Sequence, residues 1–264
     1  MCAVNLRVNN QTNIQDIAVL KFGGTSVRGI GRMQNVAQIV QSFAKQQKTI
    51  VVVSAMGDTT DHLYQLALRC AEQPDKRELD VLLSTGEQVS IALLTMILKS
   101  CGVRAKSFTG QQIGVLTEAE HGCARILTVD APHILEELED NDVIVVAGFQ
   151  GSTVDGDITT LGRGGSDTSA VALAAAVGAH VCHIFTDVDG VFTADPNKVA
   201  GAVLIPEIGY DHCFEMARNG AQVIHDRSVT LAKQHGVQIR VRNTFNPGHS
   251  GTLICADTDI ARTA

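Results

Sequence analysis

A lysine followed by paired glycines and two hydroxyl residues lies near the start of the chain, in the run VLKFGGTSV that begins at Val19. Gly23 and Gly24 have no Cβ, so the backbone there can bring its N–H groups close to an anion. Lys21 adds a positive charge on a flexible stem. The spacing matches neither a Walker A loop nor GxGxxG. Two interpretations fit: a phosphate-binding loop, or a tight strand-to-helix turn with a surface lysine.

A second glycine-rich loop, LGRGGSDTSA, begins at Leu161. Arg163 lies among its glycines, and Ser166 and Asp167 open a predicted helix. Backbone N–H groups at a helix N-terminus favour anions, and a guanidinium can hold a carboxylate in bidentate fashion. Ser166 or Asp167 could instead cap the helix. Capping is compatible with a binding role, but it does not account for an arginine between glycines.

A third polar segment, FTDVDGVFTADP, begins at Phe185 and ends a predicted strand with Thr186 and Asp187. Ligands of open α/β sheets bind at the carboxyl ends of the strands, which favours a binding role. A turn-rich connection is the alternative. A calcium loop fits poorly, because the twelfth position counted from Asp187 is Lys198 where an EF-hand needs glutamate.

The elements that must position these loops alternate along the chain. Runs rich in Val and Ile predict strands over 17–22, 49–55, 103–109, 142–149, 180–188 and 237–244. Helical spacing of apolar residues predicts helices within 30–43, 79–98, 168–179, 210–219 and 225–235. This alternation predicts an α/β fold with a mainly parallel central sheet covered by helices on both faces. The turn-rich stretch 148–167 is predicted to be a hairpin followed by the second glycine loop, and it divides the chain into two lobes.

Composition narrows the function classes. With 264 residues and 45% hydrophobic content, the chain is predicted to be globular. The net charge of -7 and the 4% aromatic content, with no tryptophan, argue against a nucleic-acid partner. Seven cysteines without a CxxC argue against a disulfide framework. No apolar run approaches the roughly 20 residues that span a bilayer, so we expect a soluble, cytoplasmic protein without a membrane partner.

Six segments together resemble the signature segments of the aspartate kinases, a branch of the amino-acid kinase superfamily. In chain order they are KFGGTSV at Lys21, SAMGDTTD at Ser54, STGEQVSIALL at Ser84, GFQG at Gly148, ITTLGRGGSDTSAVALAAA at Ile158 and TDVDGVFTADP at Thr186. The resemblance reaches from about residue 17 to about residue 255. Six separate matches in the family's order are far more specific than any single glycine loop.

The resemblance implies transfer of the γ-phosphoryl group of ATP, carried with Mg²⁺, to the side-chain carboxylate of L-aspartate. The products are 4-phospho-L-aspartate and ADP, in the first step toward lysine (through diaminopimelate), threonine and methionine. It implies one catalytic domain over 1–264 with the amino-acid kinase fold. The amino acid would bind to an N-terminal lobe of about 17–150, and the nucleotide to a C-terminal lobe of about 158–255. It also implies a homodimer.

The resemblance implies roles for individual residues as well. Lys21 and Asp167 are the catalytic pair, with Lys21 on the transferring phosphoryl group and Asp167 positioning it. The residues implied to bind aspartate are Ser54, Thr60, Glu87, Arg163 and Ser166, with Arg163 on a carboxylate and Glu87 on the ammonium. The residues implied to bind the nucleotide are Lys21, Gly23, Gly24, Thr25, Gly164, Gly165, Thr186, Asp187, Phe192, Asn197 and Gln222. No residue is assigned as a protein ligand to a metal.

Physical chemistry agrees with these roles. A side-chain carboxylate with a pKa of about 3.9 is ionised at neutral pH, so the acceptor needs no general base. The difficulty is to bring one anion up to a polyanion, which requires Lys21, backbone donors, Arg163 and Mg²⁺. Asp167 is therefore expected to orient Lys21 and not to abstract a proton.

Two positions depart from the family pattern. Asn197 stands where the family commonly has arginine, and Gln222 where some members have lysine, so nucleotide affinity is in question. The given sequence also ends soon after the segment GTLIC, whereas family members usually continue into regulatory ACT domains, so no ACT domain is expected here. We therefore expect no feedback inhibition by lysine or threonine unless a separate regulatory chain supplies it.

Two other functions remain open. Another amino-acid kinase, acting on acetylglutamate, glutamate or uridylate, would share the scaffold, although Glu87 and Arg163 match the aspartate enzymes. A catalytically silent partner that binds aspartate or nucleotide is the second.

Overall fold

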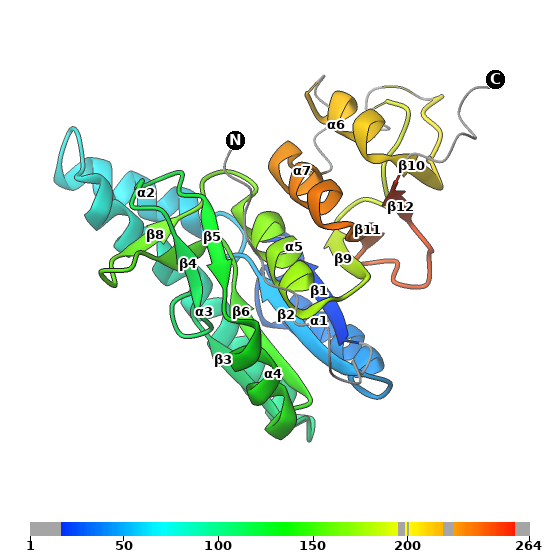
Figure 1. Cartoon of the computed structure of the whole chain (residues 1–264), viewed down its shortest axis with the longest axis horizontal. Coiled ribbons are helices and arrows are strands. Elements are labelled where there is room, and N and C mark those ends of the chain that lie inside the picture. The colour runs from blue at the N-terminus through cyan, green and yellow to red at the C-terminus, as the bar shows by residue number, and fades with distance from the viewer. Residues whose placement is uncertain (1–16, 195–198, 200, 219–223, 257–264) are drawn as a thin grey trace.

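The computed structural model describes residues 17–194, 199, 201–218 and 224–256, which form two sheets and the helices packed on them (Figure 1). The larger sheet has eight strands, in the order β10 (Glu207–Gly209), β12 (Thr252–Cys255), β11 (Gln238–Asn243), β9 (Val181–Thr186), β1 (Ile17–Phe22), β2 (Lys48–Val53), β6 (Val143–Ala147) and β3 (Ala105–Phe108). All neighbours pair in parallel except β11 with β12. The prediction of an α/β fold with a mainly parallel central sheet is confirmed.

Helices cover both faces of this sheet, because its central strands are apolar on both sides. On one face α1 (Ile30–Ala44) and α3 (Lys76–Ser100) enclose one hydrophobic cluster. On the other face α4 (Ala131–Asp140), α5 (Gly165–Val177) and α7 (Asp226–His235) enclose a second. In Figure 1, α5 lies across the near side of β1 and β2, and α1 lies behind them.

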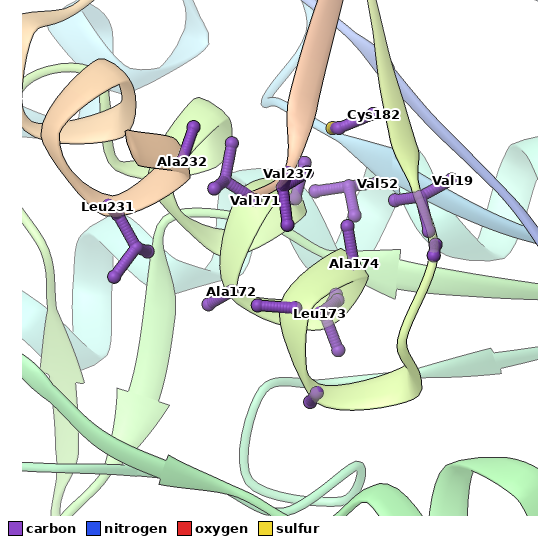
Figure 2. Close-up of a cluster of buried hydrophobic side chains, with 14 of the residues drawn as sticks. Val19, Val52, Val171, Ala172, Leu173, Ala174, Cys182, Leu231, Ala232 and Val237 are labelled. Carbon is purple, nitrogen blue, oxygen red and sulfur yellow. The ribbon is translucent and has the colours of Figure 1, made fainter. Parts of the chain in front are cut away.

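Helix α5 lies at the centre of the molecule. Twelve of its thirteen residues are buried, and most of them are alanine, serine, glycine or valine. Small side chains let the helix lie close to β1, β2 and β9 on one side and to α7 on the other. Figure 2 shows Val171 and Ala174 of α5 among Val19, Val52 and Cys182 of the sheet. This packing fixes the start of α5, which carries Asp167, against the end of β1, which carries Lys21.

A second, smaller sheet was not predicted as a unit. Its strands are β5 (Ile126–Val129), β4 (Val115–Thr117), β7 (Gln150–Ser152) and β8 (Ile158–Thr160). The antiparallel pairing of β7 with β8 confirms the hairpin predicted within 148–167. Helix α2 (Thr59–Cys70) and α4 were also missed, whereas the helix predicted over 210–219 is α6 (Tyr210–Arg218).

Helix α3 is 25 residues long and, by length and composition alone, apolar enough to cross a membrane, contrary to the expectation that nothing in the chain reaches that length. Its inward side carries buried polar residues, among them Asp80, Ser84 and Glu87. The helix also packs on β3, β6 and β8 and on helices α1 and α2. These contacts are those of an interior helix in a globular fold, which is the more economical explanation of its composition.

Candidate functional site

The two glycine loops meet through an ion pair. The ammonium of Lys21, on the penultimate residue of β1, lies 2.6 Å from Oδ1 of Asp167 in the first turn of α5. The two side chains are only 12% and 11% exposed. Two charges so far removed from water need each other, because either one alone would be left desolvated. The pair therefore holds Lys21 at the junction of both loops.

The first glycine loop is wedged against the end of β2. A Cβ at Gly24 would lie 2.8 Å from the carbonyl oxygen of Ala55, so no larger residue fits there without movement. The N–H of Gly57 donates to the carbonyl of Gly24 over 3.0 Å. Gly23 leaves space beside the ammonium of Lys21, since a Cβ there would lie 3.5 Å from Nζ. The loop thus keeps open the approach to Lys21.

Glu87 reaches the same region from α3. It is 2% exposed, and its Oε1 accepts a hydrogen bond of 2.8 Å from the N–H of Ala55. Its Oε2 is buried and has no hydrogen-bond partner among the described residues. Burial raises the pKa of Glu87 to about 7, partly offset by the bond from Ala55. A buried acceptor without a donor is an incomplete site, which an ammonium group of a ligand would complete.

The second glycine loop turns sharply into α5. Gly164 has φ of 69°, in the left-handed region that favours glycine, and a Cβ there would collide with the His225 ring. Gly164 is the N-cap and no side chain caps the helix, so the alternative that Ser166 or Asp167 does so is wrong. Arg163 is exposed, and no hydrogen bond or ion pair to it occurs among the described residues. Its guanidinium is available to a ligand.

The remaining residues implied to bind aspartate lie on three different segments of the fold. Ser166 is buried against Gly148, where a Cβ would lie 2.8 Å from the Ser166 Oγ. Ser54 is half-buried directly after β2, and its N–H donates to the carbonyl of Phe22 over 3.1 Å. Thr60 is half-buried in the first turn of α2, a helix that packs on α3.

Most of the residues implied to bind the nucleotide are among those that the structure describes. Thr186 ends β9, and its hydroxyl donates to Oδ1 of the exposed Asp187 over 3.2 Å. Half-buried Phe192 forms an isolated β-bridge with Leu204. Thr25, in the first loop, is exposed. Asn197 and Gln222 lie outside the described residues.

Metal binding by protein groups finds no support in the part of the chain that the structure describes. No group of three or more His, Cys, Asp or Glu side chains is placed there to hold an ion. Of the third segment, residues 195 and 196 lie outside the described residues. In that segment Oδ1 of Asp189 accepts a hydrogen bond of 2.9 Å from Asn243.

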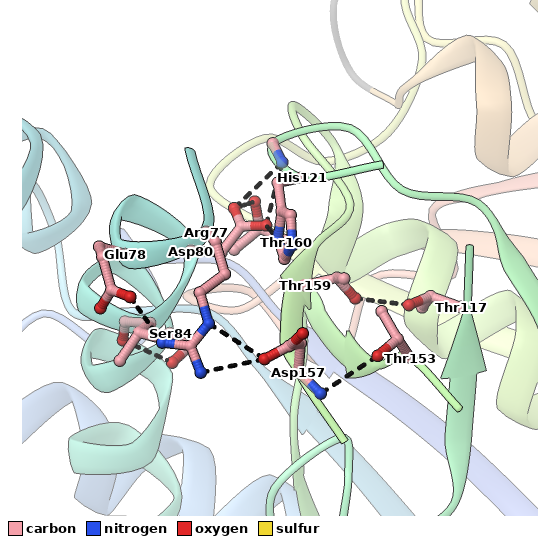
Figure 3. A network of polar contacts seen from close by, with 12 residues as sticks. Arg77, Glu78, Asp80, Ser84, Thr117, His121, Thr153, Asp157, Thr159 and Thr160 are labelled. Atoms are coloured by element: carbon pink, nitrogen blue, oxygen red, sulfur yellow. Dashed lines mark hydrogen bonds and ion pairs between the residues drawn. The ribbon is translucent and has the colours of Figure 1, made fainter. Parts of the chain in front are cut away.

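Asp80 is a buried residue of this region that the sequence analysis missed. It is fully buried on α3 (Figure 3). Glu87 follows it two helical turns later on the same helix. Its carboxylate accepts from the hydroxyl of Thr160 at 2.5 Å and from the N–H of Gly122 at 3.0 Å, and it lies 2.9 Å from Nδ1 of His121. Thr160 immediately precedes the loop of Arg163. Asp80 therefore ties the segment before Arg163 to the helix that carries Glu87.

A signal for Asp80 was present in the sequence. An acidic residue falls within the run of apolar residues that predicted the buried side of the helix, where a charge needs partners. Its partners could not be named, since Thr160 and Gly122 are far away in the chain.

Comparisons with known proteins identify the family to which this fold and this site belong. The model of the amino acid kinase family matches residues 16–243. The chain is 52% identical to an aspartokinase of Geobacillus stearothermophilus over 239 residues, which is 90% of this chain and 58% of the relative. It therefore spans less than two thirds of the length of that protein.

Two solved structures are similar throughout the described fold. The aspartate kinase from Synechocystis has a TM-score of 0.82 and 44% identity, over 94% of this chain and 41% of that one. The E. coli aspartokinase III in complex with aspartate and ADP also has a TM-score of 0.82, with 30% identity over 92% of this chain and 65% of that one. The family match, which covers most of the sequence, and the doubly covered parallel sheet lead to one conclusion: the chain belongs to the amino acid kinase family.

Proposed function

We propose that this chain is the catalytic part of an aspartate kinase, which transfers the γ-phosphoryl group of ATP to the side-chain carboxylate of L-aspartate. The ion pair between Lys21 and Asp167 carries the proposal, because it places a cation where the two glycine loops meet. The similarity to proteins named aspartokinase, at 52% and 30% identity in two cases, supports aspartate as the acceptor.

Recognition of the amino acid is assigned to Glu87 and Arg163. The unpartnered Oε2 of Glu87 would accept from the ammonium of aspartate, and the exposed guanidinium of Arg163 would hold a carboxylate. An ammonium next to Glu87 would favour its ionised form and lower its pKa from about 7. Binding of the zwitterion would therefore relieve the cost of burying this carboxylate.

Catalysis in this site is electrostatic. The acceptor carboxylate is already ionised near neutral pH, so the reaction needs no proton abstraction. Lys21 would neutralise charge on the transferring phosphoryl group, and the backbone N–H groups of the glycine loops would add donors. Asp167 lies 2.6 Å from Lys21 and holds the ammonium in place, which is a positioning role.

The residues present fit Mg²⁺ that arrives with the nucleotide. Mg²⁺ commonly keeps several waters and binds through phosphate oxygens with one or two carboxylates, so a protein cage of three or more acidic groups is not required. Asp187 is exposed after β9 and would face the ion. When bound, the ion would neutralise charge on the β- and γ-phosphates.

The two-lobe assignment belongs to the same proposal. The amino acid would bind to residues of about 17–150 and the nucleotide to residues of about 158–255, with Thr186, Asp187 and Phe192 on the nucleotide side. Homodimer formation stays a prediction, which sedimentation of the purified chain tests.

The proposal is tested by coupled measurement of ADP release. Aspartate, glutamate, acetylglutamate and UMP are offered in turn with MgATP, and the Lys21→Met variant is the inactive control. We expect aspartate-dependent ADP release at least about a hundredfold above the other acceptors, since Arg163 and Glu87 match a short amino acid. Equal turnover with another acceptor, or none with aspartate, would overturn the proposal.

A further inference from the structure

A cavity lies behind the first glycine loop, on the α1 face of the large sheet. It has a volume of about 620 Å³ and lies between α1, the end of β9 and the segment after β11. Its aromatic wall consists of Phe43, Phe185 and Phe245, and its polar wall includes Gln38, Gln46 and Arg242. A cavity with an aromatic wall and a few convergent polar groups has the composition of a small-molecule site.

Arg242 is the cation of this cavity, and its charge is not compensated. Its side chain donates to the carbonyl of Pro247 over 2.8 Å and lies 5.5 Å from the centre of the Phe185 ring. Its Nε is buried without a hydrogen-bond partner. Burial, and then the charge of Arg240, lower the pKa of Arg242. An anion at this position would satisfy the free donor and offset the repulsion between the two arginines.

The described residues that line the cavity include no acidic side chain. Among the described residues, no carboxylate forms an ion pair with Arg242, Arg240 or Arg32. Arg32 lies over the Phe245 ring, 4.9 Å from its centre. His183 also lies close to Arg242 and Arg240, and burial and the charges of these two arginines lower its pKa to about 4. In a chain with a net charge of -7, such a cationic site is selective for an anion.

The residues that line the cavity indicate which kind of anion it would bind. One guanidinium with a planar fork matches one carboxylate, and the side-chain amides can bind its remaining lone pairs. A phosphate dianion would require more positive charge or a set of backbone N–H groups. The rings of Phe43 and Phe245 offer apolar surface to the rest of the ligand, whereas the Phe185 ring, which also lines the cavity, is fully buried. We propose that this cavity binds a small monocarboxylate with an apolar or aromatic body, distinct from the site of Lys21 and Glu87.

The cavity is connected to the glycine loop by two direct contacts. The ring of Phe185 stacks on Phe22 with 4.8 Å between ring centres, and Phe22 is the residue before Gly23. Thr244, which lines the cavity, has its hydroxyl 2.6 Å from that of Ser26 in the same loop. A ligand that moves Phe185 or Thr244 would therefore move the loop of Lys21. This places a regulatory contact directly behind the proposed phosphate site.

Calorimetric titration with benzoate at constant ionic strength tests the binding. Benzamide is the neutral isostere, and inorganic phosphate tests the alternative anion. We expect saturable 1:1 binding of benzoate, at least about tenfold weaker binding of benzamide and phosphate, and at least tenfold weaker benzoate binding in Arg242→Met. Arg240→Met removes a charge from the same strand face outside the cavity wall and should weaken benzoate binding less than Arg242→Met does.

Three results would overturn the site: no saturable benzoate binding, tighter binding of phosphate than of benzoate, or a loss caused by Arg163→Met and not by Arg242→Met. The last would assign the benzoate to the proposed acceptor site. If Arg242→Met does not fold, Arg242→Lys keeps the charge without the planar fork and should weaken benzoate binding several-fold.

The connection to the loop has its own readout, which rests on the proposed function. Benzoate should shift the KM for ATP in aspartate-dependent turnover, and the shift should vanish in Arg242→Met. Binding without a shift in KM contradicts the connection alone. Absence of any turnover in the wild-type chain contradicts the proposed function and leaves the calorimetric result standing.

Discussion

The ammonium of Lys21 and the carboxylate of Asp167 form a 2.6 Å ion pair between the end of β1 and the first turn of α5. Both side chains are nearly buried. Helix α5, which carries Asp167, packs directly on β1, which carries Lys21. The pair is thus part of the core and of the candidate site at once. Its two functions can be separated by substitution.

Lys21→Met should lower aspartate-dependent turnover at least about a hundredfold and unfolding free energy by about 1–3 kcal/mol, because Asp167 is left buried and unpaired. The double variant Lys21→Met/Asp167→Asn should regain most of the stability and none of the activity. Urea unfolding and initial rates on the same preparations measure both. Recovery of turnover in the double variant would show that Lys21 is not needed for the transfer.

Glu87 should make stability depend on pH in the direction opposite to that of a salt-bridged acid. Its pKa is raised from 4.5 to about 7 in the folded chain, so the folded state binds its proton more tightly. Stability from this group is present below pH 4.5 and is lost as pH rises toward 7. Glu87→Gln should therefore be more stable than the wild type above pH 7, by at most about 3 kcal/mol, and the advantage should disappear near pH 4.5.

The same substitution should raise the KM for aspartate at least about tenfold, since the ammonium loses its partner. The KM for ATP should change little. Thermal unfolding between pH 4.5 and 8 measures the stability effect, and initial rates measure the KM. A variant less stable than the wild type at pH 8 would contradict the unpaired, desolvated state of Glu87.

Gly24→Ala tests the close approach of the first loop to β2. Its Cβ would lie 2.8 Å from a backbone oxygen, so we expect a loss of about 1–3 kcal/mol in stability and a fall in turnover. Gly31→Ala is the matched control, because this helical position has nothing within 4 Å of the added Cβ. Helix propensity predicts a gain of about 0.5–1 kcal/mol there. Equal effects of the two substitutions would contradict the steric argument.

Asp80→Asn should disturb the Arg163 loop from a distance. The amide cannot accept all the bonds that reach the Asp80 carboxylate from Thr160, Gly122 and His121, so stability should fall by about 2–4 kcal/mol. The KM for aspartate should rise more than the KM for ATP. Asp157→Asn, which affects a partly exposed ion pair with Arg77 in the same region (Figure 3), should cost less than about 1 kcal/mol. A parallel rise of both KM values would indicate general loosening and not positioning of the Arg163 loop.

Most strands of the large sheet could be predicted because they are rich in Val and Ile: β1 has the predicted bounds, and β9 and β11 lie within theirs. The three-residue edge strand β10 was not predicted. The small sheet could not be predicted, since β4 and β7 have three residues each and carry no clear alternation. Helix α2 was missed for a related reason. Ala67 is its only buried residue, so it has no apolar stripe to give a helical period.

The site was predictable to the extent that local sequence carries its chemistry. Glycine pairs beside Lys21 and Arg163 identified both loops, and the ion pair of Lys21 with Asp167 matches the contact expected from the family resemblance. The unsatisfied Oε2 of Glu87 and the bonds of Asp80 depend on tertiary neighbours far away in the chain. The missing helix cap at Ser166 has the same origin, because the N-cap is Gly164, held where His225 leaves no room for a side chain.

The most direct measurement is to trap the acyl phosphate with hydroxylamine during incubation of the purified chain with MgATP and L-aspartate, and to identify the hydroxamate by mass spectrometry. We predict a β-hydroxamate of aspartate, formed in proportion to ADP, abolished in Lys21→Met and strongly reduced in Arg163→Met. ADP formation without any aspartyl hydroxamate, or the same hydroxamate yield from Lys21→Met, would contradict phosphoryl transfer to aspartate at the junction of the two glycine loops.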